Sequence, residues 1–390
     1  MLRRGHPNRP GPTGAHSCRR EETARLGPPL GGAVWHARRV IKYLGSKRVL
    51  VPVLGRLARA SEATDALDLF TGTTRVAQQF CREGLFTFAV DIATYSEVLA
   101  QTYVETDGDE VDVDQVRAAI DHLESLAPRR GYFTRTFCEQ SRYFQPKNGM
   151  RVDAIREGID EHYPDGPLRP ILLTSLMEAA DAVDSTVGLQ MAYLKSWAPR
   201  SHKTLEMKVP QFTPGTGKAV RGDATDLVDL LPHVGLAYLD PPYNQHRYFT
   251  NYHIWETLIR WDEPEHYGVA CKRIDARDEA TKSVFNKKRE MPAALADVIS
   301  RVQADTLILS FSDEGFAPIE DLVEACESRG DHVEVLAFDS ARHIGARIGI
   351  HNLDGEKVGK VSHTRNTEYV VVSGEETRVK HMVEEATRGS

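Results

Sequence analysis

The chain has 390 residues, of which 41% are hydrophobic and 27% charged, a composition typical of a globular protein with a sizeable core. No apolar run approaches the roughly 20 residues that cross a bilayer, so we expect no membrane association. The N-terminus is basic but no apolar segment follows it, which predicts no secretory signal. The formal net charge of −7 excludes little, because nucleic acids are held by local basic surfaces that the total charge can hide.

Cysteine and histidine patterns exclude two kinds of site. The five cysteines form no CxxC pair, and the fifteen histidines show no HExxH spacing. We therefore expect neither a disulfide framework nor a bound metal, and the free cysteines suit a reducing cytoplasm.

The order of predicted elements indicates the fold class. Residues 1–37 are rich in Arg, Gly and Pro without apolar periodicity, which predicts a disordered tail. Strand-like apolar runs then follow, each with a turn and a helical pattern after it. These runs are residues 66–70, 87–91, 236–240, 306–311 and 368–372. Strands that alternate with helices predict an α/β fold, in which helices cover a parallel or mixed sheet.

One long segment interrupts this alternation. Residues 106–215 have a mostly helical pattern in which aromatic and basic residues are mixed. We expect an inserted domain or lobe there, between a first part of the α/β domain at 38–105 and a second part at 216–380.

The first two strands end in residues suited to a nucleotide-like ligand. Asp68-Leu69-Phe70-Thr71-Gly72 marks a strand-to-helix turn, where glycine lets the backbone approach a ligand, although a plain turn has the same pattern. Asp91 ends the next strand about 20 residues later, where nucleotide-binding sheets place an acid on the ribose hydroxyls. The alternative is that Asp91 caps the following helix. The GxGxxG of dinucleotide binders is absent, which argues against NAD or FAD.

Asp240-Pro241-Pro242-Tyr243 is the most specific motif, because it follows an apolar strand directly. Each proline fixes its own φ and restricts the residue before it, so the loop is stiff. Such a loop can offer the Asp240 carboxylate and the Pro241 carbonyl to the two N–H groups of an exocyclic amine. The Tyr243 ring can stack on a planar base. The alternative is a turn that only terminates the strand.

Taken in order, these motifs resemble the Dam-type, D12-class adenine-N6 DNA methyltransferases. The resemblance spans residues 40–105 and 215–375. Residues 42–47, Lys-Tyr-Leu-Gly-Ser-Lys, are similar to the family's N-terminal K-[WY]-x-G-[GS]-K motif, and residues 248–253 to its F-T-x-Y-H stretch. Gly222-Asp223-Ala224 is a weaker match. Thr73-Thr74 departs from the small residue and second glycine that family members often have.

The resemblance implies a Rossmann-like, S-adenosylmethionine-dependent methyltransferase sheet with residues 106–215 as a target-recognition domain. It implies methyl transfer from S-adenosylmethionine to N6 of an adenine rotated out of duplex DNA. The implied catalytic residues are Asp240, Pro241 and Tyr243. The implied cofactor-binding residues are Tyr43, Lys47, Asp68, Phe70, Gly72, Asp91, Ile92 and Asp223.

DNA contacts are expected in two places. The resemblance puts Tyr248, Phe249 and Tyr252 near the flipped base. In the inserted segment, Arg135, Arg142 and Tyr143 belong to stretches where basic and aromatic residues alternate, which suits phosphate contacts and base stacking. For any one of them, an aromatic core with solvated arginines is an equal alternative. A second basic run, Lys282 to Arg289, can equally be a solvated face.

Three other functions stay open. Ribosomal guanine-N2 methyltransferases, and RNA methyltransferases more widely, share the turn and the loop, but they usually lack the N-terminal motif and a long insertion. Cytosine-N4 enzymes more often have Ser in place of Asp240. A catalytically decayed DNA-binding relative would not need the intact acids. The resemblance leaves open a partnership with a cognate restriction endonuclease, the DNA sequence recognised, the oligomeric state and a bacterial or phage source; we expect a cytoplasmic location.

Overall fold

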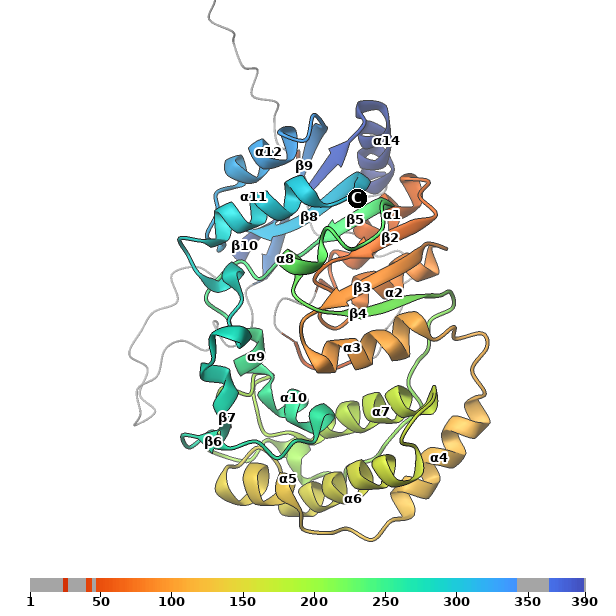
Figure 1. Ribbon diagram of the computed structural model, residues 1–390, viewed down its shortest axis with the longest axis vertical. Coiled ribbons are helices and arrows are strands. Elements are labelled where there is room, and N and C mark those ends of the chain that lie inside the picture. The colour runs from red at the N-terminus through yellow and green to blue at the C-terminus, as the bar shows by residue number, and fades with distance from the viewer. Residues whose placement is uncertain (1–23, 27–39, 44–46, 342–364, 389–390) are drawn as a thin grey trace, which may run out of the picture.

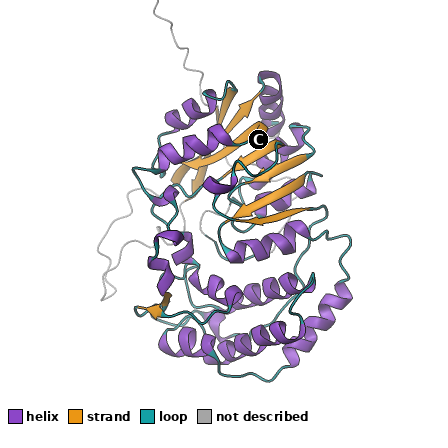
Figure 2. Cartoon of the chain, viewed as in Figure 1, coloured by secondary structure: helices purple, strands orange, loops and turns teal. Residues whose placement is uncertain are grey.

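The computed structural model describes residues 24–26, 40–43, 47–341 and 365–388. In these residues a sheet flanked by helices packs against a helical lobe (Figure 1). Strands are confined to the sheet apart from one short hairpin at the side of the lobe, as the colouring by secondary structure shows (Figure 2). Across the described ranges, no helix is both long and apolar enough for a membrane span.

The main sheet has eight described strands in the order β1-β9-β10-β8-β5-β2-β3-β4. Their bounds are β1 (Ala24–Leu26), β2 (Asp65–Asp68), β3 (Phe86–Asp91), β4 (Gly217–Arg221), β5 (Val234–Leu239), β8 (Ala304–Ser312), β9 (His332–Ala341) and β10 (Arg365–Gly374). The five central and edge strands from β8 to β4 are parallel, and β10 runs antiparallel between β8 and β9. This Rossmann-like α/β sheet confirms the predicted fold class. The apolar runs did not predict β4 and β9.

Both faces of the central strands are buried under helices, because successive side chains point to opposite faces. Leu67 and Leu307 belong to the core on one face, and Ala66 and Ile308 to the core on the other. The first face is covered by α8 (Ala224–Leu227), α11 (Met291–Arg301) and α12 (Ile319–Glu327). The second face is covered by α1 (Val51–Ala60), α2 (Arg75–Arg82) and α14 (Glu376–Thr387).

The lobe is built by four helices of the inserted segment. They are α4 (Val113–Ser125), α5 (Tyr132–Thr134), α6 (Pro146–His162) and α7 (Leu168–Val183). Their apolar core continues into α3 (Thr94–Ala100) and α10 (His253–Arg260), through residues such as Leu99 and Trp255. The helical character of residues 106–215 is therefore as predicted. However, the lobe shares its core with the helices next to the sheet, so it does not have a core of its own.

The expected disordered tail contains one exception. Ala24–Leu26 forms β1, which pairs in parallel with β9, Ala24 lying opposite Leu336. These three residues are a strand in this structure, and the disordered tail stays a prediction for the segment as a whole. The remainder of 1–37 lies outside the described residues.

The order of the strands reverses at β2. From β2 the chain builds outward through β3 and β4, and then returns to the other side of β2 with β5. Asp68 lies opposite Ala89 of β3 and Tyr238 of β5, so the ends of these three strands meet at one edge. Ligands of open α/β sheets bind outside the carboxyl ends of strands at such a reversal.

Candidate active site

A cavity of about 330 Å³ lies at this edge, within the range of about 300–1,000 Å³ usual for small-molecule sites. Every residue expected to bind the cofactor lines it: Tyr43, Lys47, Asp68, Phe70, Gly72, Asp91, Ile92 and Asp223. Asp240, Tyr248 and Phe249 also line it. Pro241, Tyr243 and Tyr252 are not among the described residues that form its wall. Residues 44–46 of the N-terminal motif lie outside the described residues.

Asp91 joins the turns that follow β2 and β3. Its Oδ2 accepts a hydrogen bond from the Gly72 amide at 2.9 Å, and its Oδ1 accepts one from the Ala93 amide at 2.9 Å. Gly72 has a φ of +51°, and a Cβ there would lie 3.1 Å from the Tyr43 ring. The turn therefore requires glycine for its backbone conformation and for the space beside Tyr43.

Asp68 lies under the same turn and is almost completely buried. Its Oδ2 accepts hydrogen bonds from Thr71 Oγ1 at 3.0 Å and from the Ala77 amide at 3.2 Å. Its Oδ1 has no hydrogen-bond partner among the described residues. Burial raises the pKa of this carboxyl to about 7. A buried carboxylate oxygen without a partner, at the wall of a cavity, suits a cationic group of a ligand.

The loop after β5 brings the predicted catalytic acid next to a lysine of the N-terminal motif. Lys47 Nζ lies 3.0 Å from Asp240 Oδ1 and 3.4 Å from Glu368 Oε2 on β10. Burial raises the pKa of Asp240 to about 6, although the Lys47 ammonium acts in the opposite direction. The Lys47 ammonium also lies 5.4 Å from the centroid of the Tyr243 ring. The sequence did not single out Glu368, which lies more than 100 residues from the catalytic loop.

The loop after β5, residues 240–247, which we call the predicted catalytic loop, is held by residues that the sequence motifs did not indicate. Asn286 Nδ2 donates to the carbonyl oxygens of Asn244 at 2.7 Å and His246 at 3.1 Å. The Phe316 amide donates to the Tyr243 carbonyl at 2.9 Å. In the sequence Asn286 belonged only to a basic run, and no local signal connects it with a loop some forty residues earlier.

Three tyrosines form a stack between the cavity and the lobe. The ring of Tyr43 lies 4.6 Å from Tyr252 and 5.2 Å from Tyr248, measured between centroids. Tyr252 has no exposed surface. In this structure the Tyr252 ring is stacked on Tyr43, so the expected contact with DNA stays a prediction that would require the side chain to move. Tyr248 is half-buried and lines the cavity, so it stays a candidate for contact with a base.

The residues of the lobe that were expected to contact DNA also differ in burial. Tyr143 is completely buried, and its hydroxyl donates to the Gln190 carbonyl at 2.6 Å. In this structure Tyr143 belongs to the aromatic core, so its expected contact with DNA stays a prediction that would require the side chain to leave that core. Arg142 and Arg135 are both half-buried, and the Arg142 guanidinium lies 4.9 Å from the Trp197 ring centroid. Both arginines remain predictions.

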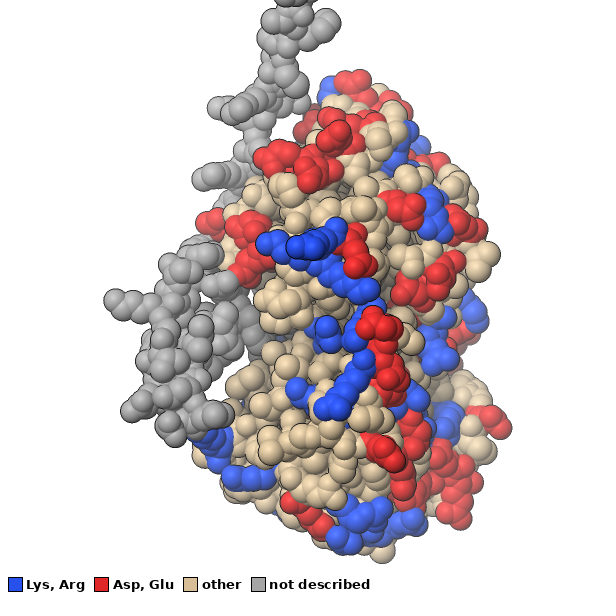
Figure 3. Space-filling view, turned by 60° about the vertical axis from the view of Figure 1, so that its left-hand side comes forward, with Lys and Arg blue, Asp and Glu red and all other residues tan. Residues whose placement is uncertain are grey.

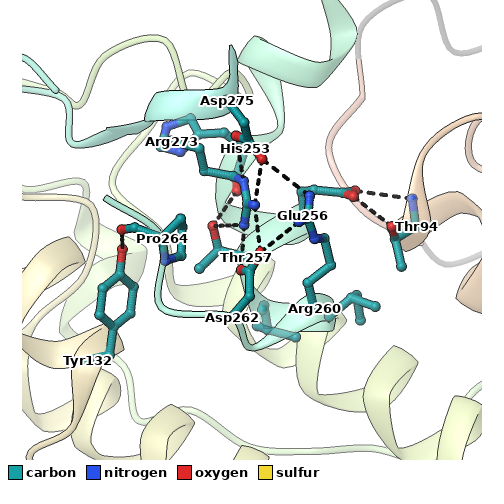
Figure 4. Close-up of polar contacts among 12 residues, drawn as sticks. Thr94, Tyr132, His253, Glu256, Thr257, Arg260, Asp262, Pro264, Arg273 and Asp275 are labelled. Atoms are coloured by element: carbon teal, nitrogen blue, oxygen red, sulfur yellow. Dashed lines mark hydrogen bonds and ion pairs between the residues drawn. The ribbon is translucent and has the colours of Figure 1, made fainter. Parts of the chain in front are cut away.

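A polar network on α10 connects the cavity with the hairpin of β6 (His266–Tyr267) and β7 (Lys272–Arg273), as Figure 4 shows. Glu256 accepts from the hydroxyl of Thr94 at 2.6 Å and from its amide at 3.1 Å. Buried Arg273 donates to Asp262 at 2.7 Å from two nitrogens, and to Asp275 at 2.7 Å. No local sequence pattern indicates this network, because its members bear charges that are ordinary on exposed surfaces.

Comparison with known proteins identifies the family. Residues 43–306, more than half of the chain, match the family model described as D12 class N6 adenine-specific DNA methyltransferase. The chain belongs to this family, which confirms the family expected from the sequence motifs.

Individual relatives are distant in sequence. The chain is 29% identical over 304 residues to modification methylase StsI of Streptococcus sanguinis, covering 72% of this chain and 45% of the relative. It is 28% identical over 275 residues to type II methyltransferase M.NlaIII of Neisseria lactamica, covering 68% and 80%. It is 26% identical over 298 residues to type II methyltransferase M.CviAII of Paramecium bursaria Chlorella virus 1, covering 74% and 89%. The chain thus spans about half the length of the first relative and most of the other two.

Proposed function

We propose that this chain binds S-adenosylmethionine in the cavity and methylates N6 of an adenine that has rotated out of duplex DNA. The observation that carries the proposal is the convergence of Asp68, Asp91 and Asp240 on one cavity, from the ends of three adjacent strands. The family to which the chain belongs supports the choice of adenine in DNA.

The residues of the cavity fit S-adenosylmethionine chemically. The unpartnered Oδ1 of Asp68 suits the ammonium group of the cofactor, and Asp91 suits its ribose hydroxyls. Ile92 is half-exposed and offers apolar surface for the adenine ring. Lys47 would hold the carboxylate. When bound, the cofactor supplies an electrophilic methyl group.

The catalytic loop would position the target amine. Asp240 and the Pro241 carbonyl would accept hydrogen bonds from the two N6 hydrogens, which leaves the nitrogen lone pair free to attack. The Lys47 ammonium, 3.0 Å from Asp240, favours the ionised carboxylate that this role requires. The amine becomes acidic as it is alkylated, so Asp240 can take the proton without a high pKa. Alignment and fixed charges would supply most of the catalysis.

The direct test is a methyl-transfer assay with labelled S-adenosylmethionine, in which duplex DNA and total RNA are offered separately. The nucleosides of the digested product are identified by mass spectrometry. We expect N6-methyladenine in DNA alone. Methylguanine or methyladenine in RNA would instead support an RNA methyltransferase.

The matched control is Asp240→Ala, which we expect to abolish transfer while cofactor affinity, measured by calorimetry, stays within about threefold of wild type (RT ln 3 is about 0.6 kcal/mol). A loss of cofactor affinity equal to the loss of activity would contradict the role of Asp240. Cofactor binding by the wild type without any product would support a decayed relative.

We further infer that methylation is site-specific and serves modification, since the relatives carry the names modification methylase and type II methyltransferase. A cognate restriction endonuclease would then recognise the same sequence, and the enzyme would act in the cytoplasm. Sequencing of N6-methyladenine in the DNA of an expressing host tests this inference. One recognition sequence methylated throughout the DNA supports it, and methylation scattered without a common sequence overturns it.

A further inference from the structure

A second cavity, of about 740 Å³, lies beside the catalytic loop. It shares no lining residue with the active-site cavity. The short helix α9 (Tyr248–Asn251) separates the two, since Tyr248 and Phe249 line the first while Thr250 and Asn251 line the second. The two cavities therefore lie on either side of one short helix that belongs to the segment after β5.

The second cavity contains a buried donor without a partner. Asn251 is only 3% exposed, and its Nδ2 has no hydrogen-bond partner among the described residues. Leaving such a group unpaired costs about 1–3 kcal/mol. A ligand that brings a hydrogen-bond acceptor to Asn251 would remove this cost. The edge of a nucleic-acid base carries such acceptors.

The second cavity is also lined by basic side chains. Arg247 of the catalytic loop, Arg277 and Lys282 line it. The Arg277 guanidinium lies 3.9 Å from the centroid of the Tyr267 ring, which holds it in a fixed orientation. Figure 3 turns the side carrying α9 and the hairpin toward the viewer, and Lys and Arg side chains cross the middle of this face. Cations placed in this way suit the phosphates of a DNA backbone.

The lobe also contributes to the lining. Leu189 and Met191 line the cavity, and Met191 is 44% exposed. Gln190 between them is fixed to the junction of α9 and α10: its amide donates to the Asn251 carbonyl at 2.8 Å, and its Oε1 accepts from the Ile254 amide at 2.8 Å. The flexible, polarisable thioether of Met191 therefore sits on a rigid support, where it can pack against the flat face of a base.

We propose that this second cavity binds the nucleotide next to the target adenine on the same DNA strand, and that Asn251 reads an acceptor on its base. Arg247, Arg277 and Lys282 hold the adjoining phosphates. The proposal rests on the proposed function, and it makes Asn251 a determinant of sequence specificity at one position beside the methylated base.

The test uses the full chain and duplex oligonucleotides in which the positions on both sides of the target adenine are randomised. The methylated products of wild type and Asn251→Asp are sequenced. The substitution keeps the shape of the side chain but replaces its donor with an acceptor, so we expect the preference at one adjacent position to change by about tenfold, the equivalent of one hydrogen bond of about 1.4 kcal/mol. Cofactor affinity should stay unchanged. An unaltered preference, or an equal loss for every sequence, would overturn the reading role of Asn251.

A second variant tests the phosphate contacts without touching a buried group. Arg277→Gln should weaken binding to all duplexes alike and reduce the slope of log affinity against log salt by about 1. The matched control is Arg59→Gln, which removes an exposed arginine, also engaged with a neighbour, at the far end of α1. An Arg277 variant that behaves like the control would overturn the contact. If wild type methylates no DNA at all, the proposed function itself fails. If wild type is active but the variants show no change in sequence preference or salt dependence, only this further inference fails.

Discussion

Lys47 Nζ lies 3.0 Å from Asp240 Oδ1. Lys47 precedes α1 and Asp240 follows β5, so the residues of the whole lobe separate the two in the sequence. The pair joins the N-terminal motif to the catalytic loop, and Glu368 on β10 shares the same ammonium at 3.4 Å. Burial raises the pKa of the acid that is proposed to hold the target amine, and the charge of Lys47 opposes this by favouring the ionised carboxylate.

The first prediction concerns the pH dependence of methyl transfer. The pKa of Asp240 is raised to about 6, so kcat/KM for DNA at saturating cofactor should fall about tenfold per pH unit below about 6, as the carboxylate is protonated. Lys47→Gln removes the charge that lowers this pKa, and its acid limb should move upward by about one unit or more. Lys47→Arg keeps a positive charge and should stay close to wild type. Identical acid limbs in all three proteins would contradict the prediction.

The second prediction concerns stability. Burial raises the pKa of Asp68 from 3.8 to about 7, so the folded state binds this proton more tightly than the unfolded chain. The contribution of Asp68 to the free energy of unfolding is therefore fully present below pH 4 and is lost as pH rises through about 7. Asp68→Asn removes this loss. In urea unfolding without cofactor, the free energy of unfolding of the variant relative to wild type should increase between pH 4 and pH 8. A difference in the free energy of unfolding that does not change with pH would refute the raised pKa of Asp68.

The third prediction separates two roles of Asp91. Asp91→Ala removes the acceptor for the amides of Gly72 and Ala93, which should lower the free energy of unfolding by about 1–3 kcal/mol. If Asp91 also binds the ribose, S-adenosylmethionine affinity should fall at least tenfold in titration calorimetry at a temperature where the variant is folded. The isosteric Asp91→Asn should lose less of the free energy of unfolding and less of the S-adenosylmethionine affinity than Asp91→Ala. Unchanged cofactor affinity in the folded Ala variant would leave Asp91 a purely structural role.

The fourth prediction tests the place of Tyr143 in the core. Tyr143→Phe loses one buried hydrogen bond to the Gln190 carbonyl, so the free energy of unfolding should fall by about 1 kcal/mol. Affinity for duplex DNA, measured by fluorescence anisotropy, should not change. Arg142→Gln is the contrast: its side chain is half-buried and donates to the Lys195 carbonyl at 3.0 Å, so a small loss of stability is expected, and DNA binding should weaken if the lobe contacts phosphate. A loss of DNA affinity in a stable Tyr143→Phe protein would support the original prediction.

The fifth prediction concerns the network in Figure 4. Arg273 is buried between Asp262 and Asp275, and its replacement by Ala leaves two half-buried carboxylates with Arg260 as their remaining ion-pair partner among the described residues. Arg273→Ala should lower the free energy of unfolding by about 3 kcal/mol in urea denaturation. Arg273→Lys keeps the charge but not the paired geometry, so its free energy of unfolding should lie between those of wild type and Arg273→Ala. A loss below about 0.5 kcal/mol would show that the ion pairs are effectively solvated.

The sequence by itself determined the class of fold, the family and several of the residues that line the cavity at the carboxyl edge of the sheet. Local sequence features predicted the place of Asp68, Gly72, Asp91 and Asp240, because turns, strand ends and prolines are recognised locally. The ends of parallel strands must also meet at one edge of a sheet. The resemblance to the family added Tyr43 and Lys47, which line the same cavity.

Only the tertiary structure decided which side chains face outward and which distant segments meet. Tyr143 and Tyr252 have the same composition signal as exposed recognition residues, but packing buries both, since an aromatic ring serves a core as readily as a base. Glu368, Asn286 and Glu256 became visible only when chain segments far apart in sequence came into contact. The short β4 and the long β9 also depended on neighbours, because a strand is stabilised by partners that local sequence does not specify.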